Sequence, residues 1–286
     1  MLSPAIIFAL LSLVIGGLNE VVFKRYSARE RSRGMMICGV GVVWAVLLIT
    51  DVTIRGDVIV FNSASWSFGL VAGILVAIAN ILLLESLRHM EVSLGSTIYR
   101  LNTIAVVFLS VIFLGESLSL IKLAGVGCGI IAVLLLYRQQ HSTGFHQTLK
   151  TGLIIVIAGA LLRAVYGVVT KAGLSEGADA DTLMLISALC WIVSGLLYAV
   201  VIEHRYSITR AKLVYSLVSG LLVYGIVKTL VKALSLGEAS VVITIANMSF
   251  LMALLVALVL KMEALSAKKL IAMIFAISAI TLLSYA

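Results

Sequence analysis

The chain has 286 residues, of which 62% are hydrophobic and 12% charged, and its mean hydropathy is +1.19. A soluble domain carries about 25% charged residues, so this composition excludes a disordered chain, a disulfide scaffold and an ordinary water-soluble enzyme. The formal charge of +8 therefore predicts basic loops that fix membrane orientation, with no nucleic acid as partner.

Ten apolar segments follow one another along the chain, each about long enough to cross a bilayer as a helix. They cover residues 3–23, 35–52, 66–87, 93–114, 119–138, 150–171, 182–202, 212–233, 239–260 and 267–285. The connections are short and leave no room for a soluble domain. The first segment has no basic stretch before it and no cleavage site after it, so we expect a retained helix. The predicted fold is an all-α polytopic membrane protein.

The two halves of the chain resemble each other under a shift of 147 residues. The matched pairs include Lys24 and Lys171, Trp44 and Trp191, Glu91 and Glu238, Ser93 and Ser240, Glu116 and Glu263, and Lys122 and Lys269. This pattern predicts two five-helix repeats, residues 1–147 and 148–286. Because five is odd, the second repeat enters the membrane from the opposite side, and inverted repeats are typical of secondary transporters.

The loop charges are distributed unevenly between the two membrane faces. Side A is the face that holds the connections after the odd-numbered helices, and side B is the opposite face. Of the 21 lysines and arginines, three lie inside predicted helices and four on side B (Arg55, Lys122, Lys171 and Lys232), which leaves 14 on side A. The positive-inside rule then places side A in the cytoplasm and both termini outside.

The pattern resembles the drug/metabolite transporter superfamily, specifically its ten-helix EamA-like members. The resemblance rests on the paired repeats, on the lysine that closes the first helix of each repeat, and on the junction Phe113-Leu114-Gly115-Glu116-Ser117-Leu118-Ser119, which returns as Leu260-Lys261-Met262-Glu263-Ala264-Leu265-Ser266. It implies a membrane transporter with no cofactor.

The chain departs from that family at three points. Many members carry a proline midway along the fourth and ninth helices, where this chain has Thr103 and Phe250, and Met262 replaces the junction glycine in the second repeat. The resemblance also implies cytoplasmic termini, whereas the charge count places them outside. Both orientations stay open.

Three cations, Arg100, Arg163 and Lys228, lie deep inside predicted helices, where an ionisable residue is costly and by default functional. Arg100 shares a helical stripe with Thr97, and its repeat equivalent Asn247 shares one with Thr244. Two matching stripes predict one central cavity. If the three cations face it, the cavity is electropositive and suits an anionic group.

The predicted substrate-binding set adds the deep tyrosines and one amide to these residues. In full it is Arg100, Arg163, Lys228, Asn247, Tyr166, Tyr224, Asn80, Tyr99, Thr97 and Thr244. Glu20 and Glu85 are the candidates for proton coupling. The competing structural interpretation is that Arg100 pairs with Glu20 or Glu85 and holds helices together, because buried charges usually have partners.

Several other polar residues have plainer interpretations. Lys24, Lys122, Lys171 and Lys232 lie near helix ends and are expected to extend to the headgroups. Glu116 and Glu263 precede a helix, where a carboxylate favours the positive end of the helix dipole. The three cysteines have no metal or disulfide spacing, so no metal site is expected.

These observations predict a secondary transporter of a small polar metabolite, anionic or zwitterionic, working by alternating access with proton coupling or exchange. The alternatives are a flippase for a lipid-linked intermediate or lipid headgroup, and an exporter of cationic drugs or metabolites. An enzyme is not expected, since the sequence shows no His/Asp/Glu cluster at a helix end and no acidic metal motif. No nucleotide-binding Gly-x-x-x-x-Gly-Lys-Ser/Thr sequence is present either, so the energy for transport is expected from a proton or from exchange. The expected setting is the bacterial cytoplasmic (inner) membrane, with the lipid bilayer and a small-molecule substrate as partners, as a monomer or homodimer.

Overall fold

The computed structural model describes residues 2–27, 32–86, 89, 98–137, 146–259 and 266–285, and these described residues form helices and no strand. The helices of the first half are α1 (Pro4–Ser27), α2 (Arg33–Arg55), α3 (Ser63–Ser86), α5 (Asn102–Leu114, preceded by helical residues 98–100) and α6 (Leu120–Tyr137). Those of the second half are α7 (His146–Ser175), α8 (Ala180–Leu197, continued by a π-helical turn over Tyr198–Ile202), α9 (Arg210–Leu236), α10 (Ala239–Asn247), α11 (Phe250–Val259) and α12 (Ala267–Leu283).

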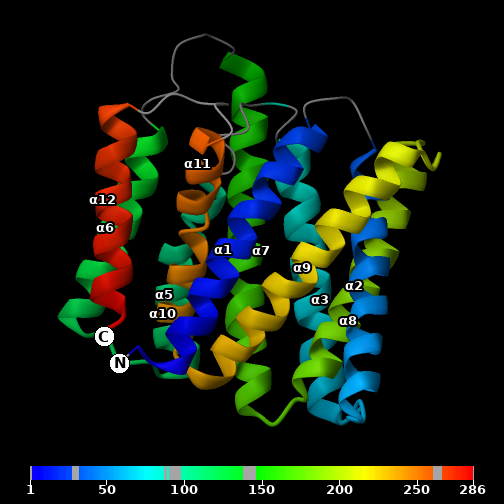
Figure 1. The fold of residues 1–286 in the computed structure, drawn as a ribbon, viewed down its shortest axis with the longest axis horizontal. Coiled ribbons are helices and arrows are strands. Elements are labelled where there is room, and N and C mark those ends of the chain that lie inside the picture. Colours follow the sequence, from blue (N-terminus) through cyan, green and yellow to red (C-terminus); the bar gives the residue numbers. More distant parts are fainter. Residues whose placement is uncertain are drawn as a thin grey trace.

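The described parts of the ten predicted spans fall on these helices once residues 98–114 are taken as one crossing and α10 with α11 as another. Residues 87, 93–97, 138 and 260 of the predicted spans lie outside the described residues. Seven crossings among the described residues are long and apolar enough to span a bilayer by length and composition, and Ile98–Leu114 and Leu120–Leu135 form shorter apolar helices. Both termini lie at the same end of the bundle, as an even number of crossings requires (Figure 1). The predicted fold class, an all-α polytopic membrane protein, is confirmed.

The helices pack as expected for two halves that are related by a two-fold axis across the bundle. A shift of 147 residues carries α1 onto α7, α2 onto α8, α3 onto α9 and α6 onto α12. Helix α3 packs extensively on α7 and α1 packs extensively on α9, while α2 pairs with α8 and α6 with α12. Because α1 starts at the end where the termini lie and α7 starts at the opposite end, the halves are inverted (Figure 1). The repeat boundary at residues 147 and 148 stays a prediction.

The α2–α8 pair approaches closely because small residues meet at its crossing. A methyl group on Gly34 would lie 2.5 Å from the backbone nitrogen of Ala199, and one on Gly195 would lie 2.5 Å from the backbone nitrogen of Cys38. Such contacts let helix backbones pack tightly in a membrane. Further along the same pair, the rings of Trp44 and Trp191, which are repeat equivalents, pack edge to face with centroids 5.9 Å apart.

The fourth and ninth crossings are interrupted at equivalent positions, Leu101 and Met248, which the sequence did not predict. At each break the backbone hydrogen bond spans three residues, as in a 3-10 helix, where an α-helix would span four. The backbone nitrogen of Leu101 donates to the carbonyl of Ile98, and that of Met248 donates to the carbonyl of Ile245, both at 3.0 Å. Neither break contains proline or glycine. Polar side chains gather there instead and offer alternative hydrogen bonds.

The junction after α5 corrects two expectations. Gly115 ends α5 with a φ of 66°, a left-handed conformation that glycine adopts without strain. Glu116 does stabilise a helix N-terminus, but it is that of α10 in the other half and not that of α6, which follows it in sequence. Lys122, expected to extend to the headgroups, is 1% exposed and forms an ion pair with Glu238.

Candidate functional site

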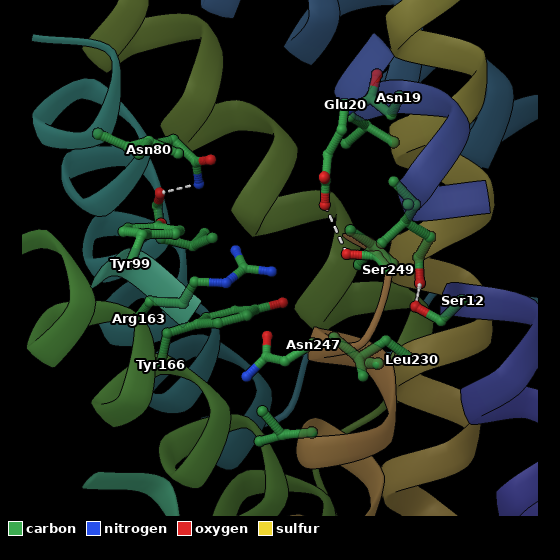
Figure 2. Close-up of a pocket in the computed structure, with 18 of the residues that line it drawn as sticks. Ser12, Asn19, Glu20, Asn80, Tyr99, Arg163, Tyr166, Leu230, Asn247 and Ser249 are labelled. Atoms are coloured by element: carbon green, nitrogen blue, oxygen red, sulfur yellow. Dashed lines mark hydrogen bonds between the residues drawn. The ribbon is translucent and has the colours of Figure 1, made fainter. Parts of the chain in front are cut away.

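A cavity of about 170 Å3 is lined by side chains from both halves of the chain (Figure 2). Side chains from α1, α2, α3, α7, α8, α9 and α10 line it, together with residues 98–100 and the break after α10. Its volume is below the range of about 300–1,000 Å3 that is usual for drug-sized ligands. The cavity therefore suits a solute of metabolite size.

Many of the lining residues are repeat equivalents, 147 positions apart. These pairs are Gly16 and Arg163, Asn19 and Tyr166, Trp44 and Trp191, Val76 and Val223, Asn80 and Val227, Leu83 and Leu230, Tyr99 and Ala246, and Arg100 and Asn247. Equivalent positions can line one cavity only if it lies on the axis that relates the repeats. The central cavity expected from the two polar stripes is therefore present.

Arg100 is paired within this cavity. Its guanidinium forms an ion pair with the carboxylate of Glu20 on α1 and lies 5.0 Å from the ring centroid of Phe250. The other oxygen of Glu20 accepts a hydrogen bond from the hydroxyl of Ser249 at 2.6 Å. Of the two partners that the sequence left open, the structure selects Glu20, so the charge of Arg100 is balanced by a residue of the same cavity.

Arg163 lines the cavity without a carboxylate partner among the described residues. Its guanidinium carbon lies 5.6 Å from the ring centroid of Tyr99, which is a cation–π contact. The side chain extends into the open space beside Tyr166 (Figure 2). Since Glu20 and Arg100 neutralise each other, Arg163 leaves the cavity with a net positive charge.

Three buried donors around the cavity have no hydrogen-bond partner among the residues that the structure describes. They are the indole nitrogens of Trp44 and Trp191 and the hydroxyl of Tyr99, whose residues are 1%, 4% and 6% exposed. A buried donor without an acceptor costs free energy comparable to a lost hydrogen bond. A solute that brings acceptor atoms into the cavity would remove that cost.

The lower part of the cavity is organised by the two helix breaks. The side-chain amide of Asn247 donates to the side-chain oxygens of Asn102, at 2.6 Å, and Thr103, at 2.8 Å. These three residues flank the breaks in the ninth and fourth crossings, so their hydrogen bonds join the two interrupted helices. Higher in the cavity, the amide of Asn80 donates to the carbonyl of Val76 at 2.7 Å (Figure 2).

Other predicted site residues lie elsewhere. Lys228 and Tyr224 do not line the cavity; the ammonium of Lys228 contacts the carboxylate of Asp51 at 2.6 Å and the hydroxyl of Tyr224 at 3.0 Å, near the side-B end. Thr244 is buried and donates to the carbonyl of Ser240 within α10.

The remaining predicted residues, Glu85 and Thr97, are not found in the cavity lining of the described residues. Glu85 accepts a hydrogen bond from the hydroxyl of Tyr198 and does not line the cavity. Thr97 lies outside the described residues. Of the two predicted coupling carboxylates, Glu20 is therefore the one that the cavity contains.

The sequence did not single out Ser12 and Ser249, and it indicated Asn19 only as a polar position beside Glu20 on the first helix. The hydroxyl of Ser12 donates to the carbonyl of Ile226 at 3.2 Å, and Asn19 accepts from Ser219 at 2.6 Å. The repeat offered one usable signal, because Ser249 is the equivalent of Asn102 at the matching helix break. Among the described residues, no group of His, Cys, Asp or Glu could hold a metal ion.

The cavity is more exposed toward side A. Glu20, near the side-A end of α1, has a side chain that is 33% exposed, and Phe23 and Leu83 on the same side are half-buried. Toward side B the lining ends at Leu230 and Ile243, which belong to a buried apolar core. The cavity is thus closed by packed side chains on side B.

Comparison with known proteins matches the first half of the chain to a known family. The model of the EamA-like transporter family matches residues 3–138, and no curated protein matches. A solved structure titled "Crystal structure of protein" superposes with a TM-score of 0.85 at 14% identity, covering 99% of this chain and 96% of its own, which shows the shared fold. Residues 3–138 thus match the EamA-like transporter family of the drug/metabolite transporter superfamily, a family that transports small solutes, and the described helices are those of a multi-pass membrane protein.

Proposed function

We propose that this protein is a secondary transporter of a small anionic or zwitterionic metabolite, working by alternating access. The observation that carries the proposal is Arg163, a cation that lines the central cavity and has no carboxylate partner in the part of the chain that the structure describes. An arginine presents a planar fork of donors that matches a carboxylate or phosphate. An anionic group of the solute would take the place of the missing partner.

The charge balance of the other deep cations supports this choice. Glu20 neutralises Arg100, and Asp51 neutralises Lys228 outside the cavity. Arg163 is therefore the anchor, with the unpaired hydroxyl of Tyr99 and the indole nitrogens beside the cavity as further donors. A solute with an ammonium group in addition to its anionic group could approach the carboxylate of Glu20, which is why zwitterions remain in the proposed class.

Glu20 is the proposed coupling residue. Its side chain is 33% exposed and its two oxygens bind Arg100 and Ser249. Protonation would remove the charge that holds Arg100 and free that guanidinium for the solute. Proton and anion would then bind together, so a proton gradient could drive uptake of the solute in the same direction.

A cationic substrate is disfavoured by the same pairing. Its natural acceptor would be Glu20, whose charge Arg100 already balances, and Arg163 would repel it across the cavity.

The test begins with purified protein and a metabolite panel of monocarboxylates, amino acids, phosphorylated metabolites and quaternary amines, with thermal stabilisation as the readout. A ligand that binds the native state raises the melting temperature by mass action. Hits are then assayed for uptake into proteoliposomes, beside a fluorescent lipid reporter for flippase activity. Stabilisation by the amines alone, or movement of the lipid reporter alone, would contradict the proposal.

The sharpest variant is Arg163→Gln. Because charged hydrogen bonds contribute about 1.5–3 kcal/mol, we expect affinity for the anionic solute to fall by roughly 10- to 150-fold. The melting temperature without ligand should hardly change, since Arg163 forms no ion pair with any described residue. Lys232→Gln is the matched control: it removes one positive charge from an exposed position on α9. Unchanged affinity in Arg163→Gln would remove Arg163 from the site.

A further inference from the structure

A group of charged contacts joins the two repeats at the side-B end, away from the cavity. We call Glu116, Lys122, Glu238 and Ser240 the side-B latch. Glu116 and Lys122 belong to the first half, at the junction between α5 and α6 and in the first turn of α6, whereas Glu238 and Ser240 stand at the start of α10. Each of its two charged contacts therefore crosses from one repeat to the other.

Glu116 holds the N-terminus of α10. Its carboxylate accepts hydrogen bonds from the backbone nitrogens of Ala239, at 2.5 Å, and Ser240, at 3.1 Å, and from the Ser240 hydroxyl. A helix N-terminus carries unpaired N–H groups and a partial positive charge, so a carboxylate there is strongly favoured. Glu238, the N-cap residue itself, makes no capping bond with its own side chain.

Lys122 supplies the second contact. Its ammonium forms an ion pair with Glu238 and donates to the carbonyl of Ser117 at 2.6 Å. The lysine is 1% exposed, whereas the Glu238 side chain is 43% exposed. Losing Glu238 would therefore leave a buried cation with one carbonyl, while losing Lys122 would leave a carboxylate that water can still reach.

The latch covers the closed end of the cavity. Between them lies a layer of fully or almost fully buried apolar side chains that includes Ala9, Ala233, Leu234 and Val242. Helix α10 contributes to both levels, because its first turn is held by the latch and its last turns carry Ile243, Ala246 and Asn247 of the cavity wall. A movement of α10 that admits solvent from side B must first break the latch.

We propose that the side-B latch is the gate that keeps the cavity closed to side B. Inter-repeat hydrogen bonds and one buried ion pair stabilise the state described here, and their release lets α10 swing away from the α5–α6 junction and opens side B. The proposal concerns access to the cavity and makes no use of the solute's identity. The gate proposal can therefore fail while Arg163 remains the substrate anchor. Equally, Arg163 can fail as the anchor while the gate proposal holds.

The repeat gives this gate a second line of support. Glu91, Ser93, Glu263 and Lys269, 147 positions away from the latch residues, are the same four residue types. Three of them lie outside the described residues. A merely local cap would not require that acid, hydroxyl and lysine all recur at matched positions.

The test measures access from side B with a thiol reporter. In a protein whose three cysteines (Cys38, Cys128 and Cys190) are replaced by alanine, Ala9→Cys places a thiol in the layer between cavity and latch, where Ala9 is 0% exposed. A membrane-impermeant thiol reagent is applied to vesicles of each orientation. Ala77→Cys, equally buried in the core around α2 and α8, reports general loosening.

Each latch variant is then combined with the reporters. Glu116→Gln and Lys122→Met should each raise side-B labelling of Ala9→Cys by at least roughly tenfold, since each removes a charged hydrogen bond. Labelling from side A and of Ala77→Cys should stay at the parental rate. Lys232→Met is the matched control, because it removes the same charge from an exposed position near the same face and should change nothing.

A double variant separates gating from stability. Lys122→Met with Glu238→Met replaces the ion pair by apolar side chains, which often restores stability. If the latch is a gate, side-B labelling of Ala9→Cys in this double variant stays high although the melting temperature recovers. If labelling falls back with the recovered stability, if no folded latch variant labels faster than the parent, or if Ala77→Cys labels equally faster, the gate is overturned.

Discussion

The two walls of the cavity are built from equivalent helices but carry different chemistry. The first wall comprises α3, α7 and residues 98–100, and the second comprises α9, α1 and α10. Apolar positions agree between them: Val76 matches Val223, and Leu83 matches Leu230. Polar positions do not agree. Asn80 has Val227 as its equivalent, Tyr99 has Ala246, and Arg163 has Gly16.

This difference separates what the fold needs from what the site needs. Packing side chains that support the two-fold arrangement occur on both walls, so they are explained by the scaffold. Both arginines of the lining (Arg100 and Arg163) and both tyrosines (Tyr99 and Tyr166) occur on the first wall alone, and the carboxylate of Glu20 occurs on the second. The charges are therefore distributed asymmetrically in a cavity whose backbone is pseudo-symmetric. A solute with an anionic end and a cationic end would bind in one orientation.

The largest effect on stability is expected at the ion pair between Arg100 on the first wall and Glu20 on the second. Arg100→Gln leaves Glu20 with Ser249 as its remaining partner in the cavity, and we expect a loss of about 1–3 kcal/mol in unfolding free energy, because Glu20 is partly solvated. Adding Glu20→Gln should recover part of this loss. Denaturation of the single and double variants in detergent measures the coupling.

That cycle also compares the two arginines. Arg163→Gln should be nearly neutral for stability, so a fall in melting temperature equal to that of Arg100→Gln would contradict the distinction between a paired and an unpaired cation. Wild-type stability in Arg100→Gln would show that its ion pair contributes nothing.

A smaller effect follows from making the walls more alike. Asn80→Val copies the residue of the second wall and removes one amide from the cavity. Because a neutral hydrogen bond contributes about 0.5–1.5 kcal/mol, solute affinity should fall by roughly 2- to 12-fold. Titration of the panel hit measures this change, with Val76→Ala as a control for altered packing in the same helix. Unchanged affinity would limit the polar wall to Arg163 and its tyrosines.

The smallest effect is expected from Lys228→Met. Its ion pair with Asp51 lies outside the cavity, with side chains 39% and 26% exposed, and such pairs contribute less than about 1 kcal/mol. Solute affinity should stay within about twofold of the parent, since Arg55 still binds Asp51. A large loss of affinity would return Lys228 to the substrate site that the sequence predicted for it.

The sequence predicted the crossings and the repeat well, because hydropathy and a constant offset depend on the chain alone. It could not predict the breaks at Leu101 and Met248, since neither carries proline or glycine and the cause is a set of tertiary hydrogen bonds around Asn247. Depth along a helix was also predictable, and Arg100 and Arg163 do line the cavity.

Rotation about the helix axis and choice of partner were not predictable. Lys228 is as deep as expected along α9 but does not face the cavity, and Arg100 had two candidate carboxylates at similar depth. Glu116 and Lys122 were assigned to their own helix ends because their partners at the start of α10 are more than a hundred residues away. The unpaired donors beside the cavity became visible only with the packing.

The Trp44–Trp191 pair on the two-fold axis also provides an intrinsic fluorescence probe of the cavity. The chain contains three tryptophans, and the third, Trp66, is 52% exposed on α3 near Phe61. With Trp66 replaced by phenylalanine, all indole emission would come from Trp44 and Trp191, which touch each other and line the cavity. Any solute that enters, and any sliding of α2 against α8, would change the intensity or colour of that emission without an attached dye.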